Sequence, residues 1–365
     1  MPKIWRVGAW RGAVVAAAIV ATLGAVACGS SEGGSSSSPA ATEGATTGAT
    51  TGATSGADAA KKVKIAYFEF GSANTYTQAS LEGARAEAKK LGNVEIVPFD
   101  GKFDASKQAS DMQDALATGG YDGWMVYQMG PAALTFAKQA IDQGVKVVGV
   151  LVPFGPDPGK VEPQLEGQLA NTYLDHAQLG RDLADLTVKA CADTDPCKVE
   201  YLYGYKSLPF SKTIKDGFDN VIKSHPSIEV VTEQDGKYLA GPSYTVTQNA
   251  LQAHPDLNVV VTGGSQMTLG AERAVNAAGK KGQVKLIGSY GSKLGVDAVC
   301  QGRWFGETVS LPYTEGQVAV ESIADAVRGK PLPYGPAPDL VKRFSKVGSI
   351  ITKDNCADFK PQWEG

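Results

Sequence analysis

Five cysteines carry the most distinctive side-chain chemistry of this chain. Four of them form an even set in the second half of the sequence: Cys191, Cys197, Cys300 and Cys356. In an exported chain such a set is expected to pair as disulfides. Cys28 is then left over, and a leftover thiol outside the cell predicts either a covalent modification or a free reactive group.

The residues before Cys28 have the pattern of an export signal. Lys3, Arg6 and Arg11 precede a run from 12 to 27 that contains no charged side chain. Such a signal combines a basic region with an apolar region in this order. The run is shorter than the roughly 20 apolar residues of a membrane-spanning helix, so we expect a signal peptide.

The end of this signal predicts the fate of Cys28. The sequence "AVAC", residues 25–28, resembles a lipobox, at which bacterial lipoproteins are cut and diacylated on the cysteine, although Ala25 stands where leucine is usual. We expect residues 1–27 to be removed and Cys28 to carry the lipid. The alternative is an ordinary signal-peptidase site, which would leave Cys28 as an unmodified thiol.

Residues 28–60 are predicted to form a disordered tether of Ser, Gly, Thr and Ala. This segment contains the near-repeat "GATTGATTGATSGA" and has few large apolar side chains that could stabilise a fold. A flexible coil of this length has an end-to-end distance on the order of 30 Å. A folded domain could therefore move beside a membrane while attached to it.

Charge and sequence motifs argue against nucleic-acid binding and catalysis. Loss of residues 1–27 takes three positive charges and changes the formal net charge from −3 to −6, so no basic cluster suggests nucleic acid. The motifs HExxH and GxxxxGK[ST] are absent from the sequence. The histidines His176, His225 and His254 are dispersed, and we expect them at the surface. We expect no enzymatic activity, no cofactor and no metal site.

From residue 63 onward the chain alternates short apolar runs with helical patterns. "VKIAYFEF" is typical of a strand, and the following "YTQASLEGARAEAKKLG" of a helix that ends at Gly92. Seven further runs, from "VEIVPF" to "KLIGSYG", also indicate buried strands. This alternation predicts an α/β fold with doubly wound parallel sheets. About 300 residues exceed one comfortable core, so two lobes are expected, with a ligand beyond the carboxyl ends of the strands.

The order of these segments over residues 62–340 resembles the sugar-binding type I periplasmic binding proteins, the group that includes ribose-binding protein. The features that carry the resemblance include Asn74 with Tyr76, "AIDQGVKVVGV", "YLDHAQLGRDLA", "ALQAHPDLNVVVTGGSQMTLGAERAVNAAG" and "ETVSLPYTEGQVAVESIADAVRGK". The resemblance implies two similar Rossmann-like lobes that are joined by three crossings and close over a ligand. Lobe one would comprise 61–174 plus 311–340, and lobe two 175–310 plus 341–365.

Under this resemblance the four paired cysteines all fall in lobe two. Cys191 with Cys197 would close a small loop, and Cys300 with Cys356 would fix the C-terminal tail. The chain-entropy model gives about 2 and about 4 kcal/mol for these bridges. Three pairings of four cysteines are possible in principle. Neither of the two expected bridges would cross the cleft, so the hinge would stay free.

The resemblance also implies a set of ligand contacts. Asn74 and Tyr76 stand where the family has a hydrogen-bonding amide and a stacking ring; the alternative is a helix cap and core packing. The other matched positions are Phe70, Tyr127, Lys212, Tyr238, Gly264, Ser265, Tyr290 and Ser310. A sugar site needs planar hydrogen-bonding groups and flat aromatic surfaces, which this set supplies in part.

Several matched positions depart from the family pattern. Lys212 replaces an arginine, Tyr290 an aspartate and Gly264 an asparagine, and apolar Leu151 and Val152 replace an aspartate-arginine pair. Each charge-assisted hydrogen bond lost in this way would contribute on the order of 1.5 to 3 kcal/mol. A solvated surface lysine is the alternative for Lys212. We therefore expect a ligand with a larger apolar face than a pentose, such as a modified sugar, a glycoside or a cyclitol.

These patterns together predict a lipid-anchored solute-binding protein on the outer face of the cytoplasmic membrane. It would be a monomer that binds a sugar-like ligand by hinge closure and delivers it to the permease of an ABC importer. One alternative is a sensor lipoprotein that presents the ligand to a signalling receptor. A third, less favoured, is a surface glycan hydrolase.

Overall fold

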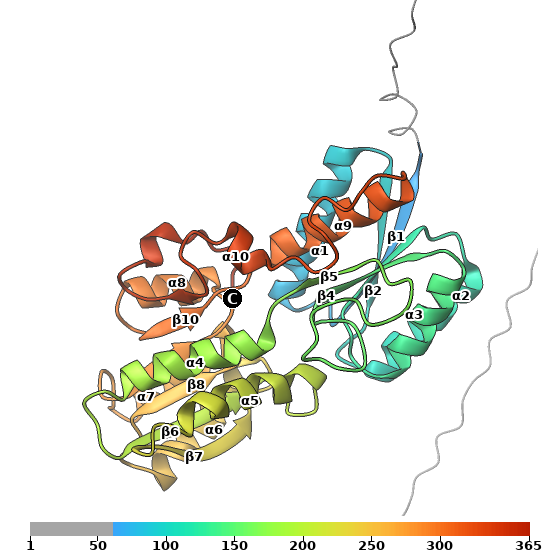
Figure 1. Ribbon diagram of the computed structural model, residues 1–365. Coiled ribbons are helices and arrows are strands. Elements are labelled where there is room, and N and C mark those ends of the chain that lie inside the picture. The colour runs from blue at the N-terminus through green and yellow to red at the C-terminus, as the bar shows by residue number, and fades with distance from the viewer. Residues whose placement is uncertain (1–60) are drawn as a thin grey trace, which may run out of the picture. The chain divides into compact units, whose positions relative to one another are not determined.

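The structure is a computed structural model and describes residues 61–365 (Figure 1). The predicted export signal, Cys28 and the predicted tether to residue 60 lie outside the described residues. The described residues fall within one compact unit, Ala53–Gly365. Their strands form two separate sheets with helices on both faces, which confirms the predicted α/β fold with two lobes. No helix within 61–365 combines the length and the apolar character that crossing a membrane requires.

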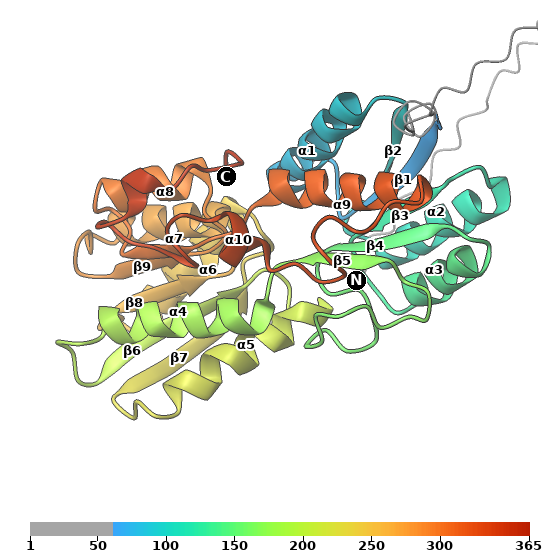
Figure 2. The same ribbon diagram turned by 45° about the horizontal axis from the view of Figure 1, so that its top comes forward.

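The first lobe is built on five parallel strands in the order β2-β1-β3-β4-β5. The strands are β1 (Val63–Glu69), β2 (Val94–Asp100), β3 (Gly123–Val126), β4 (Lys146–Leu151) and β5 (Ala170–Tyr173). Helices α1 (Thr75–Leu91) and α9 (Pro312–Val327) cover one face, and α2 (Ala105–Thr118) and α3 (Ala132–Asp142) cover the other (Figure 2).

The second lobe has six strands in the order β11-β10-β9-β8-β6-β7. They are β6 (Cys197–Tyr203), β7 (Ile228–Asp235), β8 (Val259–Thr262), β9 (Lys285–Gly288), β10 (Gly306–Thr308) and the antiparallel β11 (Ile350–Ile351). Its helices are α4 (His176–Ala190), α5 (Pro209–Ile222), α6 (Ala240–Ala253), α7 (Ser265–Ala277), α8 (Lys293–Cys300) and α10 (Leu340–Phe344), followed by the 3₁₀ turn η2 (Cys356–Asp358).

The burial of the strands differs in part from the sequence prediction. Central strands such as β3 and β8 are fully buried. In contrast, β2 and β7 are mostly half-buried, because each lies at a sheet edge. Pro98 within β2 fits this position, since an edge strand tolerates the loss of one backbone donor. The expectation that all eight runs form buried strands is therefore wrong for these two.

The lobes are connected by three segments of chain. The first joins β5 to α4, the second joins β10 to α9, and the third runs from α9 to α10. A bridge between Tyr173 and Asp339 brings the first and third segments side by side. Helix α9 therefore follows the second sheet in sequence but packs on α1 and β4 of the first lobe.

Glycines let the helices nearest the crossings approach very closely. A Cβ on Gly83 of α1 would lie 1.9 Å from the carbonyl oxygen of Tyr313, and one on Gly316 of α9 would lie 2.0 Å from that of Ser80. In the second lobe Gly180 of α4 would meet the carbonyl oxygen of Ile214 in α5 at 2.0 Å. Because both partners are backbone atoms, neither side can yield without moving a helix.

Two disulfides brace the second lobe. Cys191–Cys197 joins the end of α4 to the start of β6, and Cys300–Cys356 joins the end of α8 to the C-terminal tail. This is the pairing expected for the exported chain. Both bridges lie within one lobe, so the covalent links between the lobes are the three crossing segments.

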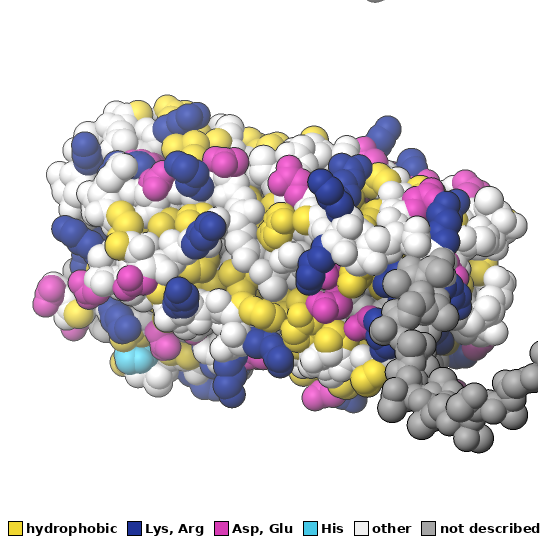
Figure 3. All heavy atoms as spheres, turned by 90° about the horizontal axis from the view of Figure 1, so that it is seen from above, with side chains coloured by type: hydrophobic (Ala, Val, Ile, Leu, Met, Phe, Trp, Pro, Cys, Tyr) yellow, Lys and Arg dark blue, Asp and Glu magenta, His cyan; other side chains and the backbone are white. Residues whose placement is uncertain are grey.

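Charged side chains on the helices pair mainly with near neighbours in sequence. Lys215 of α5 pairs with Asp219, and Lys293 of α8 pairs with Asp297, each one helical turn apart. On the face shown in Figure 3, basic and acidic side chains are interspersed rather than gathered by sign.

The close approach of α1 and α9 gives a testable prediction. We expect Gly83→Ala to lower the free energy of unfolding by about 1 to 3 kcal/mol, because the added methyl group forces two backbones apart. Gly241→Ala in α6 is the matched control: nothing lies within 4 Å of its Cβ position, and alanine should stabilise the helix by up to about 1 kcal/mol. Urea unfolding measures both, and an unchanged midpoint for Gly83→Ala would contradict the packing argument.

Candidate functional site

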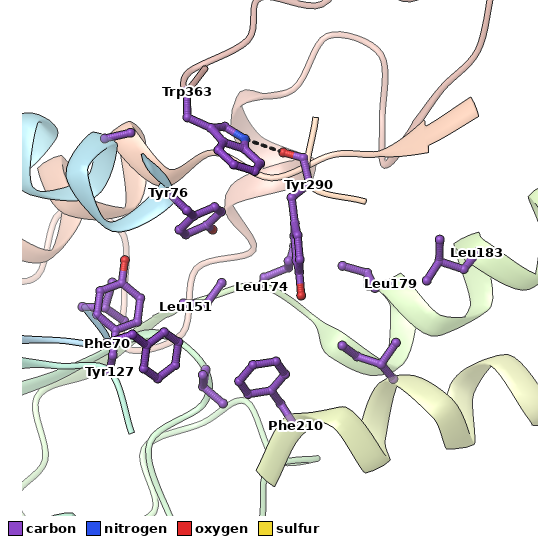
Figure 4. Packing of buried hydrophobic residues seen from close by; sticks show 14 of the residues in the cluster. Phe70, Tyr76, Tyr127, Leu151, Leu174, Leu179, Leu183, Phe210, Tyr290 and Trp363 are labelled. Atoms are coloured by element: carbon purple, nitrogen blue, oxygen red, sulfur yellow. Dashed lines mark hydrogen bonds between the residues drawn. The ribbon is translucent and has the colours of Figure 1, made fainter. Parts of the chain in front are cut away.

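A small aromatic pocket lies where the carboxyl ends of both sheets face each other (Figure 4). Its volume is about 40 Å³, whereas one water needs about 10 to 15 Å³ on this measure and ligand pockets reach roughly 300 Å³ or more. Seven of its lining side chains are aromatic and none is charged. The lining residues are Phe70, Asn74, Tyr76, Thr77, Phe103, Leu151, Phe210, Tyr238, Gln266, Tyr290 and Trp363.

Rings from the two lobes meet directly in this pocket. Phe70 of the first lobe lies 6.3 Å from Phe210 of the second, measured between ring centroids. Tyr76 and Tyr290 lie 5.8 Å apart in an edge-to-face arrangement. Such pairs are typically worth about 0.5 to 1.5 kcal/mol beyond the area that they bury. The lobes are therefore closed upon each other, and a sugar-sized molecule requires them to separate or the rings to move.

Asn74 serves as the N-cap of α1. Its Oδ1 accepts hydrogen bonds from the backbone N–H groups of Tyr76 at 2.9 Å and Thr77 at 3.3 Å. A capping side chain of this type typically contributes about 1 kcal/mol. The same side chain also lines the pocket, so the capping role and a ligand contact through the amide nitrogen are compatible.

Tyr76 connects the pocket to a buried acid. The Tyr76 hydroxyl donates a hydrogen bond of 2.8 Å to Oε1 of Glu315, which lies in the first turn of α9. Burial raises the pKa of Glu315 to about 8, and the bond from Tyr76 offsets only part of this effect. The carboxyl group is thus protonated at neutral pH, and the hydroxyl of Tyr76 already has its hydrogen-bond acceptor in Glu315.

Four of the lining residues have a left-handed backbone. The φ angles are 54° at Phe103, 63° at Leu151, 53° at Tyr238 and 80° at Tyr290. Side chains other than glycine rarely adopt this region, and each instance costs on the order of 1 to 3 kcal/mol. Such conformations cluster at functional sites, so their concentration here marks the pocket independently of its shape.

Three of the predicted contacts support the lining residues from behind. The Ser310 hydroxyl donates to the carbonyl oxygen of Tyr290 at 2.8 Å. The Ser265 hydroxyl lies within hydrogen-bonding distance of the carbonyl oxygen of Ser289 and of the buried carboxyl of Glu307, whose pKa burial raises well above its ordinary value. Tyr127 is fully buried in the first lobe, with its ring centroid 4.9 Å from that of Phe70.

The remaining two predicted residues occupy different surroundings. Gly264 is the N-cap of α7 with extended backbone, and a Cβ there would lie 3.3 Å from the ring of Tyr238. Lys212 is exposed, forms an ion pair with Asp216 and lies outside the lining residues. Phe70, Asn74, Tyr76, Tyr238 and Tyr290 are thus the predicted residues that the structure brings together around the pocket.

One histidine contradicts the sequence prediction. His176 is only 2% exposed rather than at the surface. Its ring stacks on Phe210 with centroids 4.7 Å apart, and burial lowers its pKa to about 3. A neutral imidazole behind a pocket ring is part of the packing at this junction, and its apolar partners could not be read from "DHA" in the sequence.

Several lining residues were missed by sequence reasoning. Phe210 and Gln266 lie in the first turns of α5 and α7, the helices that follow β6 and β8, so the rule that ligands bind beyond strand ends pointed to their neighbourhood. Phe103 follows β2 in the same way. Trp363 follows no parallel strand, and no local signal in the sequence connects it with the pocket.

Two α/β lobes, each built on an open sheet, with a pocket at their junction define the class of two-lobed solute receptors. A family model described as "Periplasmic binding protein domain" matches residues 65–331. The chain belongs to this family, whose name indicates a location outside the cytoplasm.

Relatives and solved structures agree with this assignment. The ribose import binding protein RbsB of Bacillus subtilis is 27% identical over 255 residues, which cover 68% of this chain and 76% of the relative. A solute-binding protein of Actinobacillus succinogenes with bound D-allose superposes with a TM-score of 0.70, 20% identity, and 82% and 100% coverage. A solute-binding protein of Bacillus halodurans with bound myo-inositol superposes with a TM-score of 0.70 and 16% sequence identity. The match covers 81% of this chain and 96% of the other.

The buried carboxyl behind Tyr76 predicts a pH dependence of stability. The pKa of Glu315 is about 8 in the folded chain against an ordinary value of 4.5. Its stabilising contribution is therefore fully present below about pH 4.5 and is lost as the pH rises through 8. Glu315→Gln keeps an acceptor but removes the ionisation. Between pH 4.5 and 8 we expect the free energy of unfolding of the variant to rise relative to that of the wild type by at most about 1.4 kcal/mol per pH unit.

Urea unfolding at pH 5, 6.5 and 8 measures this difference. Glu364→Gln is the control, because Glu364 is exposed and should leave the pH profile unchanged. A constant difference between Glu315→Gln and the wild type at all three pH values would contradict the assignment of a protonated Glu315.

Proposed function

We propose that this protein is the extracytoplasmic solute-binding component of an ABC importer and that it binds a sugar-like molecule between its lobes. The observation that carries the proposal is the pocket of seven aromatic side chains at the junction of the lobes. The relatives are named as import binding proteins for ribose and D-apiose, which supports binding and transport rather than catalysis.

Hinge closure is the proposed mechanism. Lobe one comprises residues 61–174 plus 311–340 and lobe two 175–310 plus 341–365, as the resemblance implies. A ligand that contacts both lobes stabilises the closed state by the contacts made only there, and so shifts the population toward the form that a permease recognises. A micromolar dissociation constant corresponds to about −8 kcal/mol, within reach of a few stacked rings and hydrogen bonds.

The chemistry of the lining residues favours a neutral ligand with an apolar face. Rings supply stacking surfaces, while Asn74 and Gln266 supply amide groups for hydrogen bonds. A ligand carboxylate or phosphate would be buried without a cationic partner among these residues, which is energetically costly. We infer a modified sugar, a glycoside or a cyclitol. Tyr127, Gly264, Ser265 and Ser310 are inferred to position the contact residues.

We further propose that Cys28 carries a lipid that anchors the chain to the outer face of the cytoplasmic membrane. The odd number of cysteines supports this, because the other four form disulfides. Lipid and tether would hold a monomeric receptor near its permease and raise the effective concentration. A receptor in a signalling complex is the alternative partner, and co-purification from membranes with permease or receptor subunits distinguishes the two.

Ligand binding predicts a thermal shift of the purified full-length chain. Sugars, cyclitols, glycosides and nucleosides are tested at high concentration, where a ligand at 100 times its dissociation constant adds about 2.7 kcal/mol. We expect the shift to disappear in Tyr76→Ala and in Asn74→Ala. Thr135→Ala, on an exposed position of α3, should keep it. A shift with aldopentoses alone would overturn the proposed ligand class.

The anchor is tested by fractionation of cells. We expect the wild-type protein to appear in the membrane fraction with incorporated fatty acid. The Cys28→Ser protein should be absent from the membrane fraction and carry no fatty acid, because a single side chain carries the lipid. Cys28→Ser protein that stays lipid-labelled in the membrane fraction would show that the anchor lies elsewhere. Wild-type protein without the label would refute the lipoprotein assignment.

A further inference from the structure

The C-terminal tail is firmly held by the second lobe. The disulfide Cys300–Cys356 fixes it to the end of α8. At the other end of this helix, the backbone N–H of Lys293 donates to the carbonyl oxygen of Trp363 at 2.8 Å, and that of Leu294 donates to Glu364 at 3.0 Å. These donors belong to the first helical turn, which has no intrahelical partners for them. The tail therefore satisfies α8 and moves with it.

The same tail contacts the first lobe through Gln362. Its Oε1 accepts from the backbone N–H of Thr314 at 3.0 Å, and its Nε2 donates to the Thr314 hydroxyl at 2.8 Å. Thr314 lies in the first turn of α9, whose N-cap Leu311 offers no side-chain acceptor. Gln362 thus takes the place of an N-cap side chain from a distant part of the sequence.

Trp363 lies between a tyrosine of each lobe (Figure 4). Its Nε1 donates to the carbonyl oxygen of Tyr290 in the second lobe at 2.8 Å. Its ring meets Tyr76 of the first lobe edge-to-face, with centroids 5.5 Å apart and planes at 71°. Trp363 is 6% exposed and lines the pocket.

We propose that the C-terminal tail is a latch of the binding cleft, in which Gln362 and Trp363 stabilise the closed lobes and Trp363 is a ligand-contacting residue. The inference rests on the proposed function, since it assumes that the lobes open and close. The attachments to the second lobe are a disulfide and backbone bonds, whereas those to the first are side-chain contacts. Opening of the cleft therefore breaks the contacts of Gln362 with Thr314 and of Trp363 with Tyr76.

The latch has a consequence for selectivity. Trp363 enters the pocket from outside the two sheets, so its ring adds a wall that strand-end loops do not provide. An indole presents the largest flat apolar surface of any side chain to a ligand ring. Loss of Trp363 should weaken binding of ligands with an apolar face more than binding of fully hydroxylated ones.

The test measures the distance between the lobes in the absence of ligand. Spin labels are placed at exposed positions through Gln113→Cys in α2 and Asn220→Cys in α5 of the full chain. A Cys28→Ser background leaves these as the only thiols outside disulfides. Double electron–electron resonance then compares this reference with Gln362→Ala, Trp363→Ala and the conservative Trp363→Phe. Lys360→Ala, exposed on the same tail, is the matched control.

We expect a dominant short distance in the reference and in Lys360→Ala. Gln362→Ala and Trp363→Ala should each raise the ratio of open to closed molecules by about tenfold. The first removes two hydrogen bonds to Thr314 and the second removes the ring contact with Tyr76, and both contacts exist only in the closed state. Trp363→Phe keeps a ring against Tyr76 and loses the N–H bond to Tyr290 within the second lobe, so its ratio should fall between those of Trp363→Ala and the reference. Distance distributions that coincide for all variants would overturn the latch.

Addition of myo-inositol and of methyl glycosides to the same samples separates the two proposals. Binding is read from the thermal shift of the reference, because its lobes are expected to be closed before a ligand is added. If these compounds raise the melting temperature of the reference while the tail variants keep the reference distance distribution without ligand, the solute-receptor function holds and the latch fails. If no compound raises the melting temperature but the tail variants open, the latch holds and the proposed ligand class fails. Circular dichroism tests whether each variant is folded. If Trp363→Ala does not fold, Trp363→Phe serves as the test in its place.

Discussion

The carbonyl oxygen of Tyr290 is the acceptor on which the arrangement of the pocket depends. It receives one hydrogen bond from Ser310, in the crossing that leads to the first lobe, and a second from Trp363 in the tail. Both fix a residue whose φ of 80° is unfavourable for a side chain with a Cβ. The ring of Tyr290 is thereby held against Tyr76 across the cleft. One carbonyl thus couples a sheet end, a hinge segment and the chain terminus.

Much of the fold was predictable because the signals are local and periodic. The helix after the first strand ends with Gly92 as its C-cap, as its sequence indicated, and eight apolar runs correspond to strands. Strands β5, β10 and β11 were not predicted. They have four residues or fewer, and "ANTY" in β5 contains polar residues that only its place at the sheet makes strand-like.

The site was predictable only where side chains follow parallel strands. Phe70, Asn74 and Tyr76 lie just beyond β1, and the resemblance to sugar-binding proteins pointed to them directly. Trp363 could not be found in this way, because a disulfide and the capping of α8 bring it to the pocket rather than a strand. His176 illustrates the opposite error, since a polar residue at the start of α4 is buried against Phe210 by the packing of α4 on α5 within the second lobe.

The glycine contacts have a bearing on the origin of the molecule. In the first lobe, α1 follows the first strand and contacts α9, the helix that comes after a crossing segment. In the second lobe, α5 follows the first strand and contacts α4, which likewise comes after a crossing segment. The strand order β2-β1-β3-β4-β5 recurs as β7-β6-β8-β9-β10. The chain is thus a tandem of one architectural unit, as duplication of a single ancestral half followed by an exchange of helices would produce. The tail with its tryptophan has no counterpart in the first half and breaks this internal symmetry.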